Sequence, residues 1–107
     1  MKRTIQKIVD FIQTAIEPEK IILFGSIISG NRNVYSDIDL LLVVRDSSMK
    51  NSQTEIIQNY IRELSLHADV LIFDEQEFEI MAQKTNSFIS AVLKSKIMVF
   101  EKKPRNL

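Results

Sequence analysis

The sequence has 107 residues, enough for one ordinary domain with a modest hydrophobic core, and we expect residues 1–107 to form a single domain. Fourteen basic and fourteen acidic side chains give a formal net charge of zero, so the chain lacks the positive field that strong nucleic-acid binding requires. The absence of cysteine excludes disulfides and thiolate zinc sites, and the longest apolar run, Leu40 to Val44, is far shorter than the roughly 20 residues of a membrane-spanning helix. We therefore expect a soluble, cytoplasmic protein that is not embedded in a membrane.

The first part of the sequence predicts one amphipathic helix and one short strand. Apolar residues recur at helical spacing from Ile5 to Ile16, and the helix should end near Glu17 because Pro18 disfavours helical geometry in the residue before it. Ile21 to Phe24 is an uninterrupted apolar run followed by a Gly-Ser turn, as in a buried strand. A polar, loop-like stretch follows this turn.

The middle of the sequence predicts two more strands with a helix between them. Asp37 to Val44 begins with alternating acidic and apolar residues and then becomes wholly apolar, as in a central strand. Ser52 and Glu55 have the spacing of a capping box, which predicts that a helix begins there and continues to about Leu66. Ala68 to Phe73 is expected to form the next strand.

The last part predicts two further helices and a final extended piece. Asp74 and Glu77 are expected to cap one helix, Phe88 to Leu93 marks another, and Ile97 to Phe100 is the extended piece. This order of elements predicts an α/β or α+β fold with a small mixed sheet of three to four strands flanked by helices. Periodicity alone does not determine the direction of each strand.

Three aspartates carry the strongest functional signal. Asp37 and Asp39 are two residues apart on a predicted strand, so their side chains should point to one face, roughly 6.6 to 6.8 Å apart along the backbone. Two neighbouring carboxylates repel each other unless a cation lies between them, and Mg²⁺ usually takes one or two protein carboxylates together with water and phosphate oxygens. Asp69 faces the same cleft if its strand is a neighbour, and three carboxylates suit two Mg²⁺ ions.

A candidate phosphate site precedes these acids. Gly25 and Gly30 are the only glycines in the sequence, so the backbone freedom that close turns require is concentrated in one short stretch. At Gly25 the missing β-carbon lets a phosphate approach backbone N–H groups, and the Ser26 hydroxyl adds a further donor. The sequence therefore predicts a phosphate-binding turn immediately after the first strand.

Together these motifs resemble a known signature. The run from Leu23 to Ser26, followed by Gly30 and by Ser36 to Leu41, resembles the signature of the DNA polymerase beta superfamily, specifically its minimal nucleotidyltransferases. The resemblance covers most of the chain and implies the nucleotidyltransferase fold. It also implies which residues form the site: the nucleotide, ATP or another nucleoside triphosphate, is bound by Gly25, Ser26 and Ser36, while two Mg²⁺ ions are held and catalysis is carried by Asp37, Asp39 and Asp69.

The resemblance further implies an activity and a partner. The reaction would be transfer of a nucleoside monophosphate, AMP in the case of ATP, to an acceptor hydroxyl. Stand-alone domains of this kind are often antitoxins of helical HEPN ribonuclease toxins, which implies adenylylation of a hydroxyl on such a partner protein. Both homo-oligomers and hetero-oligomers stay open.

The sequence departs from the family pattern between the two glycines. Family members usually carry arginines there, whereas this chain has Ile27, Ile28 and Ser29. Arginine supplies charged hydrogen-bond donors that isoleucine lacks, so we expect weaker triphosphate binding. This departure motivates an alternative function, a catalytically weak module that binds nucleotide and metal and neutralises a partner by covering it.

Several other residues allow a functional and an ordinary interpretation. His67, two residues before Asp69, should face the same way as that carboxylate, although a lone histidine at the start of a strand is usually structural. Asp46 and Asp74 are expected to be a loop acid and a helix cap. The Asp-x-Asp motif also occurs in metal-dependent glycosyltransferases, but the small size and the Gly-Ser turn favour nucleotidyl transfer.

Overall fold

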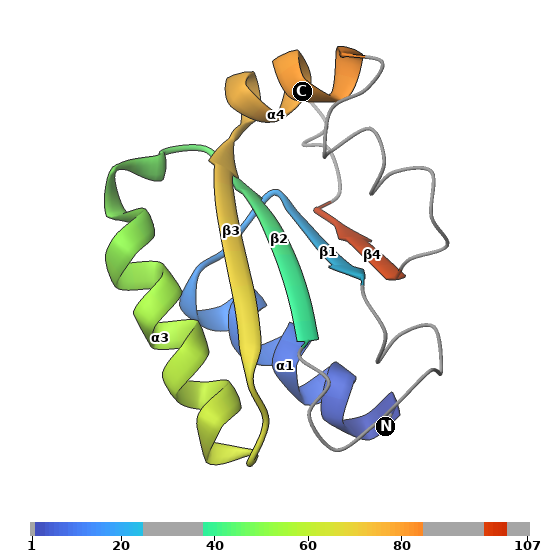
Figure 1. The fold of residues 1–107 in the computed structure, drawn as a ribbon, viewed down its shortest axis with the longest axis vertical. Helices are drawn as coiled ribbons and strands as arrows, with labels where there is room; N and C mark the ends of the chain where they lie inside the picture. Colours follow the sequence, from blue (N-terminus) through green and yellow to red (C-terminus); the bar gives the residue numbers. More distant parts are fainter. Residues whose placement is uncertain (1, 25–37, 85–97, 103–107) are drawn as a thin grey trace.

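The computed structural model describes residues 2–24, 38–84 and 98–102. The described elements in chain order are α1 (Lys2–Ala15), β1 (Lys20–Phe24), β2 (Ile38–Val44), the short 3₁₀ helix η1 (Ser47–Met49), α3 (Lys50–Glu63), β3 (Ala68–Asp74), α4 (Glu75–Gln83) and β4 (Met98–Glu101). The strands form one four-stranded sheet in the order β3-β2-β1-β4 (Figure 1). β1 pairs antiparallel with β2 and β4, and β2 pairs parallel with β3, so the predicted small mixed sheet flanked by helices is confirmed.

Helices α1 and α3 cover one face of this sheet. Their apolar residues recur at helical spacing, and every second residue of β2 points towards them, because side chains of a strand alternate between the two faces. The rings of Phe11 on α1 and Tyr60 on α3 stack with 4.0 Å between centroids, which joins the two helices. This main core contains the fully buried residues Ile8, Ile12, Ile21, Leu23, Ile38, Leu40, Leu42, Ile57 and Ile61.

Among the described elements, helix α4 covers part of the opposite face. Leu41 and Val43 of β2 point to that face and are buried against Phe78 of α4. Asp39 lies on the same face, because it precedes Leu41 by two residues in the strand. The face therefore has an apolar part near the end of β2 and a polar part near its beginning.

The caps of two helices differ in how well the sequence predicted them. The capping box of α4 is confirmed: the Glu77 N–H donates to Asp74 Oδ1 at 2.7 Å, and the Asp74 N–H donates to Glu77 Oε1 at 3.1 Å. The capping box predicted at Ser52 is wrong, because α3 already begins at Lys50 and continues directly from η1. Asp46 caps η1 by accepting a hydrogen bond from the Ser48 N–H at 2.9 Å, so the turn begins before the predicted box.

Helices α1 and α3 both end earlier than their sequences suggest. α1 ends at Ala15, and Glu17 takes a positive φ of 54° just before Pro18. α3 ends at Glu63, and Ser65 takes a positive φ of 62° in the tight turn that leads to β3.

The helix predicted at Phe88 to Leu93 lies outside the described residues. None of the described helices is long and apolar enough to span a membrane.

Candidate functional site

Two of the three predicted carboxylates stand side by side at the beginning of the parallel strand pair. Asp39 of β2 and Asp69 of β3 are register partners. Adjacent strands lie about 4.8 Å apart, and partners in a ladder point to the same face, so both carboxylates share one face of the sheet. Asp39 is half-buried and Asp69 is exposed. The structure thus confirms that their strands are neighbours.

Two hydrogen bonds support this register where the strands begin, one between backbone groups and one from a side chain to a backbone carbonyl. The Ile38 N–H donates to the carbonyl oxygen of His67 at 2.9 Å, directly before the ladder that pairs the two aspartates. Gln58 of α3 extends its amide towards the Ala68 carbonyl oxygen, with 3.5 Å between donor and acceptor. A slip by one residue would move the carboxylates to opposite faces, so these contacts hold the pair in place.

β1 lies on the other flank of Asp39. Phe24, the last residue of β1, is the register partner of Asp39 and points to the same face. Asp39 therefore has Phe24 on one side and Asp69 on the other. Gly25 and Ser26 directly follow Phe24 in the sequence, whereas Asp69 belongs to β3, the edge strand on the opposite side of β2.

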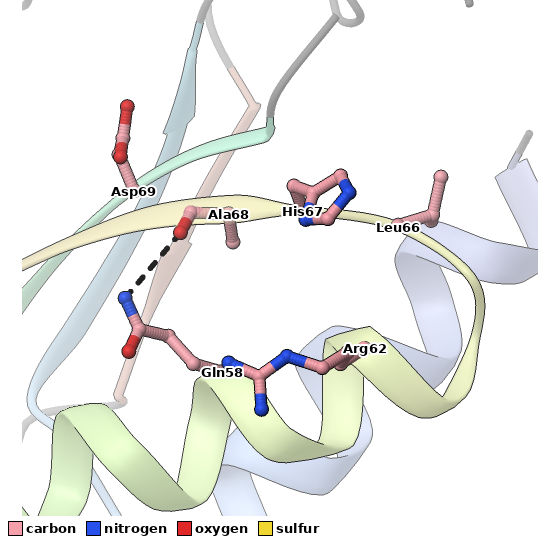
Figure 2. Close-up of a pocket in the computed structure, with 6 residues that line it drawn as sticks. All are labelled: Gln58, Arg62, Leu66, His67, Ala68 and Asp69. Atoms are coloured by element: carbon pink, nitrogen blue, oxygen red, sulfur yellow. Dashed lines mark hydrogen bonds between the residues drawn. The ribbon is translucent and has the colours of Figure 1, made fainter. Parts of the chain in front are cut away.

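A pocket of about 410 Å³ opens beside Asp69, where the edge strand β3 begins. Figure 2 shows the Asp69 side chain on the side of the strand away from α3, while Gln58 and Arg62 extend from α3 below the strand. His67, which directly precedes β3, also lines the pocket (Figure 2). The described lining of the pocket therefore runs from the first residues of β3 to the last turns of α3.

Arg62 is the cation among the described residues that line this pocket, and it lies in the last turn of α3. Its Nη1 donates to Asn59 Oδ1 at 2.9 Å, which restrains the exposed guanidinium. The ion pairs found within the described part of the chain are Lys20–Glu101 and Arg45–Glu19, and neither involves Arg62. Its charge is therefore not neutralised by a carboxylate among the described residues.

Gln58 and Arg62 were not recognised as site residues from the sequence. They are four residues apart on a helix and so share one face of it. The signal that points to them is the tight turn between α3 and β3, which returns the chain so that the last helical turns lie beside the first residues of β3. That signal emerges only when the packing of α3 on β3 is known.

The other predicted site residues, Gly25, Ser26, Ser36 and Asp37, lie outside the described residues. Within the described part, no cluster of three or more His, Asp and Glu side chains is arranged to hold a metal ion. The Asp39 and Asp69 pair nevertheless fits a hard divalent cation, because Mg²⁺ commonly takes one or two protein carboxylates and fills its octahedron with water and phosphate oxygens. Asp37 precedes Asp39 by two residues in the sequence.

The chain is similar to one protein family and to one solved structure. The family model described as polymerase beta, nucleotidyltransferase matches residues 6–105. The crystal structure of a candidate nucleotidyltransferase superposes with a TM-score of 0.50 and 14% sequence identity, covering 92% of this chain and 98% of that one. At this identity the superposition indicates a shared fold. The search of curated proteins finds no significant match.

Proposed function

Because the chain belongs to the polymerase beta nucleotidyltransferase family, we propose that it transfers AMP from ATP to a hydroxyl group of a partner protein. The observation that carries this proposal is the side-by-side placement of Asp39 and Asp69 on parallel strands. Family membership supports nucleotidyl transfer in general. The choice of ATP and of a protein acceptor is the proposed part.

In the proposed site, the metal and the nucleotide are bound by different residues. Asp37 and Asp39, with Asp69 as the third carboxylate, would hold Mg²⁺, and the nucleotide would be bound by Gly25, Ser26 and Ser36. Bound Mg²⁺ would supply positive charge to the phosphate oxygens and lower the pKa of a coordinated hydroxyl. Concentrating carboxylates at one point is otherwise unfavourable, so a metal role gives Asp39 and Asp69 a physical reason to be neighbours.

Asp69 is suited to the acceptor side of the reaction. It is exposed, it lies on the edge strand, and it lines the pocket at that edge. In the proposed step the acceptor oxygen attacks the α-phosphorus of ATP and forms a new P–O bond. The bond between the α-phosphorus and the oxygen that bridges it to the β-phosphate breaks, pyrophosphate leaves, and the hydroxyl proton passes to Asp69 and then to water.

We propose a helical HEPN-type toxin as the partner, encoded next to this protein, which would act as its antitoxin in the cytoplasm. A tyrosine hydroxyl is the favoured acceptor chemically, because its pKa of about 10 makes it easier to deprotonate than a serine hydroxyl. The attached AMP would place a bulky anion on the toxin. Such an anion would repel RNA from a basic surface of the toxin.

A second function is favoured by one feature of the sequence. Ile27, Ile28 and Ser29 occupy the segment where family members usually carry arginines. A chain that holds the triphosphate weakly would act mainly by binding and covering the toxin. The two functions differ in whether neutralisation of the toxin requires the carboxylates.

The experiment combines the protein, Mg²⁺ and ATP with the neighbouring toxin and measures the intact mass and the ribonuclease activity of the toxin. Adenylylation adds one AMP to the toxin and silences it, and the Asp37→Asn/Asp39→Asn variant leaves both mass and activity unchanged. Arg45→Gln serves as a matched control, because Arg45 is exposed and lies beyond the far end of β2. If the toxin is silenced without a mass change, and the double variant silences it equally well, the binding function replaces the transferase function.

A further inference from the structure

Among the described residues that line the pocket beside Asp69, none is proposed above to bind the nucleotide directly. Gly25 and Ser26 follow β1, which borders Asp39 on one flank, whereas the pocket opens at β3 on the other flank. Two substrates that meet at Asp39 and Asp69 would therefore approach from opposite sides of β2. This placement assigns the pocket to the second substrate, the acceptor.

The charges around the pocket are arranged to select among acceptors. Asp69 lines the pocket at the beginning of β3, with its carboxylate on the side of the strand away from α3, and Arg62 lines it from α3 on the other side of the strand (Figure 2). Gln58 and His67 also line the pocket and add polar groups to it. Leu66 and Ala68 complete the lining with small apolar surface.

A carboxylate alone at this edge would repel an acidic acceptor. Near Arg62, an acidic acceptor would instead be attracted. No carboxylate of the described residues lies within ion-pair distance of this arginine, so its charge can attract an acidic group. Asn59 holds one guanidinium nitrogen, and the remaining donors of the fork can bind a carboxylate in two-point fashion. Binding an acidic group there costs little reorganisation, because the guanidinium is already restrained.

From these observations we infer that the pocket is the acceptor subsite, and that it selects a hydroxyl-bearing protein segment with an acidic residue next to the modified residue. The inference rests on the proposed function, since it names the class of acceptor for the same site. The acceptor hydroxyl lies at Asp69 and loses its proton there, while the neighbouring carboxylate binds Arg62. Arg62 and Gln58 are positioning residues, because neither takes part in the bonds that form and break.

The test uses fluorescein-labelled synthetic peptides that contain one tyrosine followed by Glu, Gln or Lys, and measures their binding to the full chain by fluorescence anisotropy. The Glu peptide is expected to bind most tightly, with replacement of its Glu by Gln raising Kd about fivefold, the size of one charged contact at an exposed site. Arg62→Gln should remove that difference, Arg62→Lys should restore part of it, and Arg62→Glu should favour the Lys peptide. Arg45→Gln, which changes an exposed arginine outside the pocket, should leave all three Kd values unchanged.

Binding and transfer are then measured separately on the same variants. With Mg²⁺ and ATP, Arg62→Gln should raise KM for the Glu peptide while leaving KM for ATP and kcat nearly unchanged, which a general loss of structure would not do. Equal binding of the three peptides, no binding of any of them, or an unchanged preference in Arg62→Glu overturns the acceptor subsite. Selective binding of the Glu peptide without AMP transfer to peptide or toxin overturns the proposed reaction and leaves the binding site standing.

Discussion

The parallel strands β2 and β3 carry aspartates near both of their ends, and the two ends use them differently. Near the beginning, Asp39 and Asp69 are register partners whose side chains lie next to each other on one face of the sheet. Near the other end, Asp74 closes β3 and Asp46 follows β2, and each accepts a hydrogen bond from the backbone N–H of a helix that starts there.

This comparison separates carboxylates that cap a helix from carboxylates that lie next to each other on neighbouring strands. A carboxylate that accepts backbone N–H groups at a helix start is satisfied by its own chain and stabilises the fold. Two carboxylates placed side by side repel each other, and a bound cation would reduce that repulsion. The same residue type on the same two strands is therefore expected to produce loss of activity at one end and loss of stability at the other.

The largest expected effect is on activity, at the beginning of the strands. Asp37→Asn combined with Asp39→Asn should lower nucleotidyl transfer by roughly 10³-fold or more, because several kcal/mol of charge stabilisation at the phosphates would be lost. The melting temperature should stay the same or rise slightly as the repulsion is removed. Radiolabelled AMP transfer and thermal unfolding of the same preparations test this, and wild-type turnover in the variant would contradict the metal role.

Asp69→Asn should separate catalysis from nucleotide binding. Transfer is expected to fall by about 10²- to 10⁴-fold, the usual contribution of a group that handles the proton of the attacking hydroxyl. The Kd for ATP and Mg²⁺ should change little, because Asp69 lies on β3, whereas Gly25 and Ser26, which are proposed to bind the phosphates, directly follow β1 in the sequence. Isothermal titration measures the Kd, and a parallel loss of ATP binding would reassign Asp69 to the nucleotide-bound metal.

Most of the fold follows from local patterns in the sequence. Apolar patterns predicted α1 and the three strands that begin at Lys20, Ile38 and Ala68, and the spacing of Asp74 and Glu77 predicted the cap of α4. Each of these features depends on residues close together in the chain. The start of α3 was predicted wrongly at Ser52. The helical turn there starts earlier, at η1, which is capped by Asp46. Ser52 and Glu55 have the spacing of a capping box, but the structure does not use them as a cap.

The site was predictable only in part. Alternation places Asp39 on the face opposite the main core, but it says nothing about which strand is its neighbour, and a shift of β3 by two residues would keep the face and break the pair. The pocket was missed for a related reason. Arg62 and Asp69 both line it because α3 packs against β3, a contact between elements that no short sequence pattern encodes.

At the other end of the strands, Asp74→Ala should destabilise the fold without affecting chemistry. It removes an acceptor for the Glu77 N–H in the capping box of α4, and loss of such a cap costs about 1 kcal/mol of unfolding free energy. Urea denaturation measures this loss. Glu79→Ala, a change of an exposed acid within the same helix, is the matched control and should cost much less. A decrease in kcat of the folded Asp74→Ala protein would mean that the two ends are not separate in function.

The smallest expected effect concerns Asp46 and appears only in acid. The backbone N–H and the side chain of Ser48 donate to this carboxylate and lower its pKa from the ordinary value of 3.8. In the unfolded chain the carboxyl therefore takes up its proton at a higher pH than in the folded one. Its contribution to stability is complete above pH 3.8 and is lost as the pH falls through that value towards the lower pKa of the folded state.

Two substitutions isolate this contribution. Asp46→Asn keeps a side-chain oxygen able to cap η1 but cannot titrate, whereas Asp46→Ala removes both the cap and the titration. Urea unfolding at neutral pH and at pH values below 3.8 should give a small advantage of the wild type over Asp46→Asn that disappears in acid. Asp46→Ala should be less stable than Asp46→Asn at every pH. A constant difference between wild type and Asp46→Asn across this range would show that the charge of Asp46 adds nothing to its cap, because only a charge-dependent contribution changes when the carboxylate is protonated.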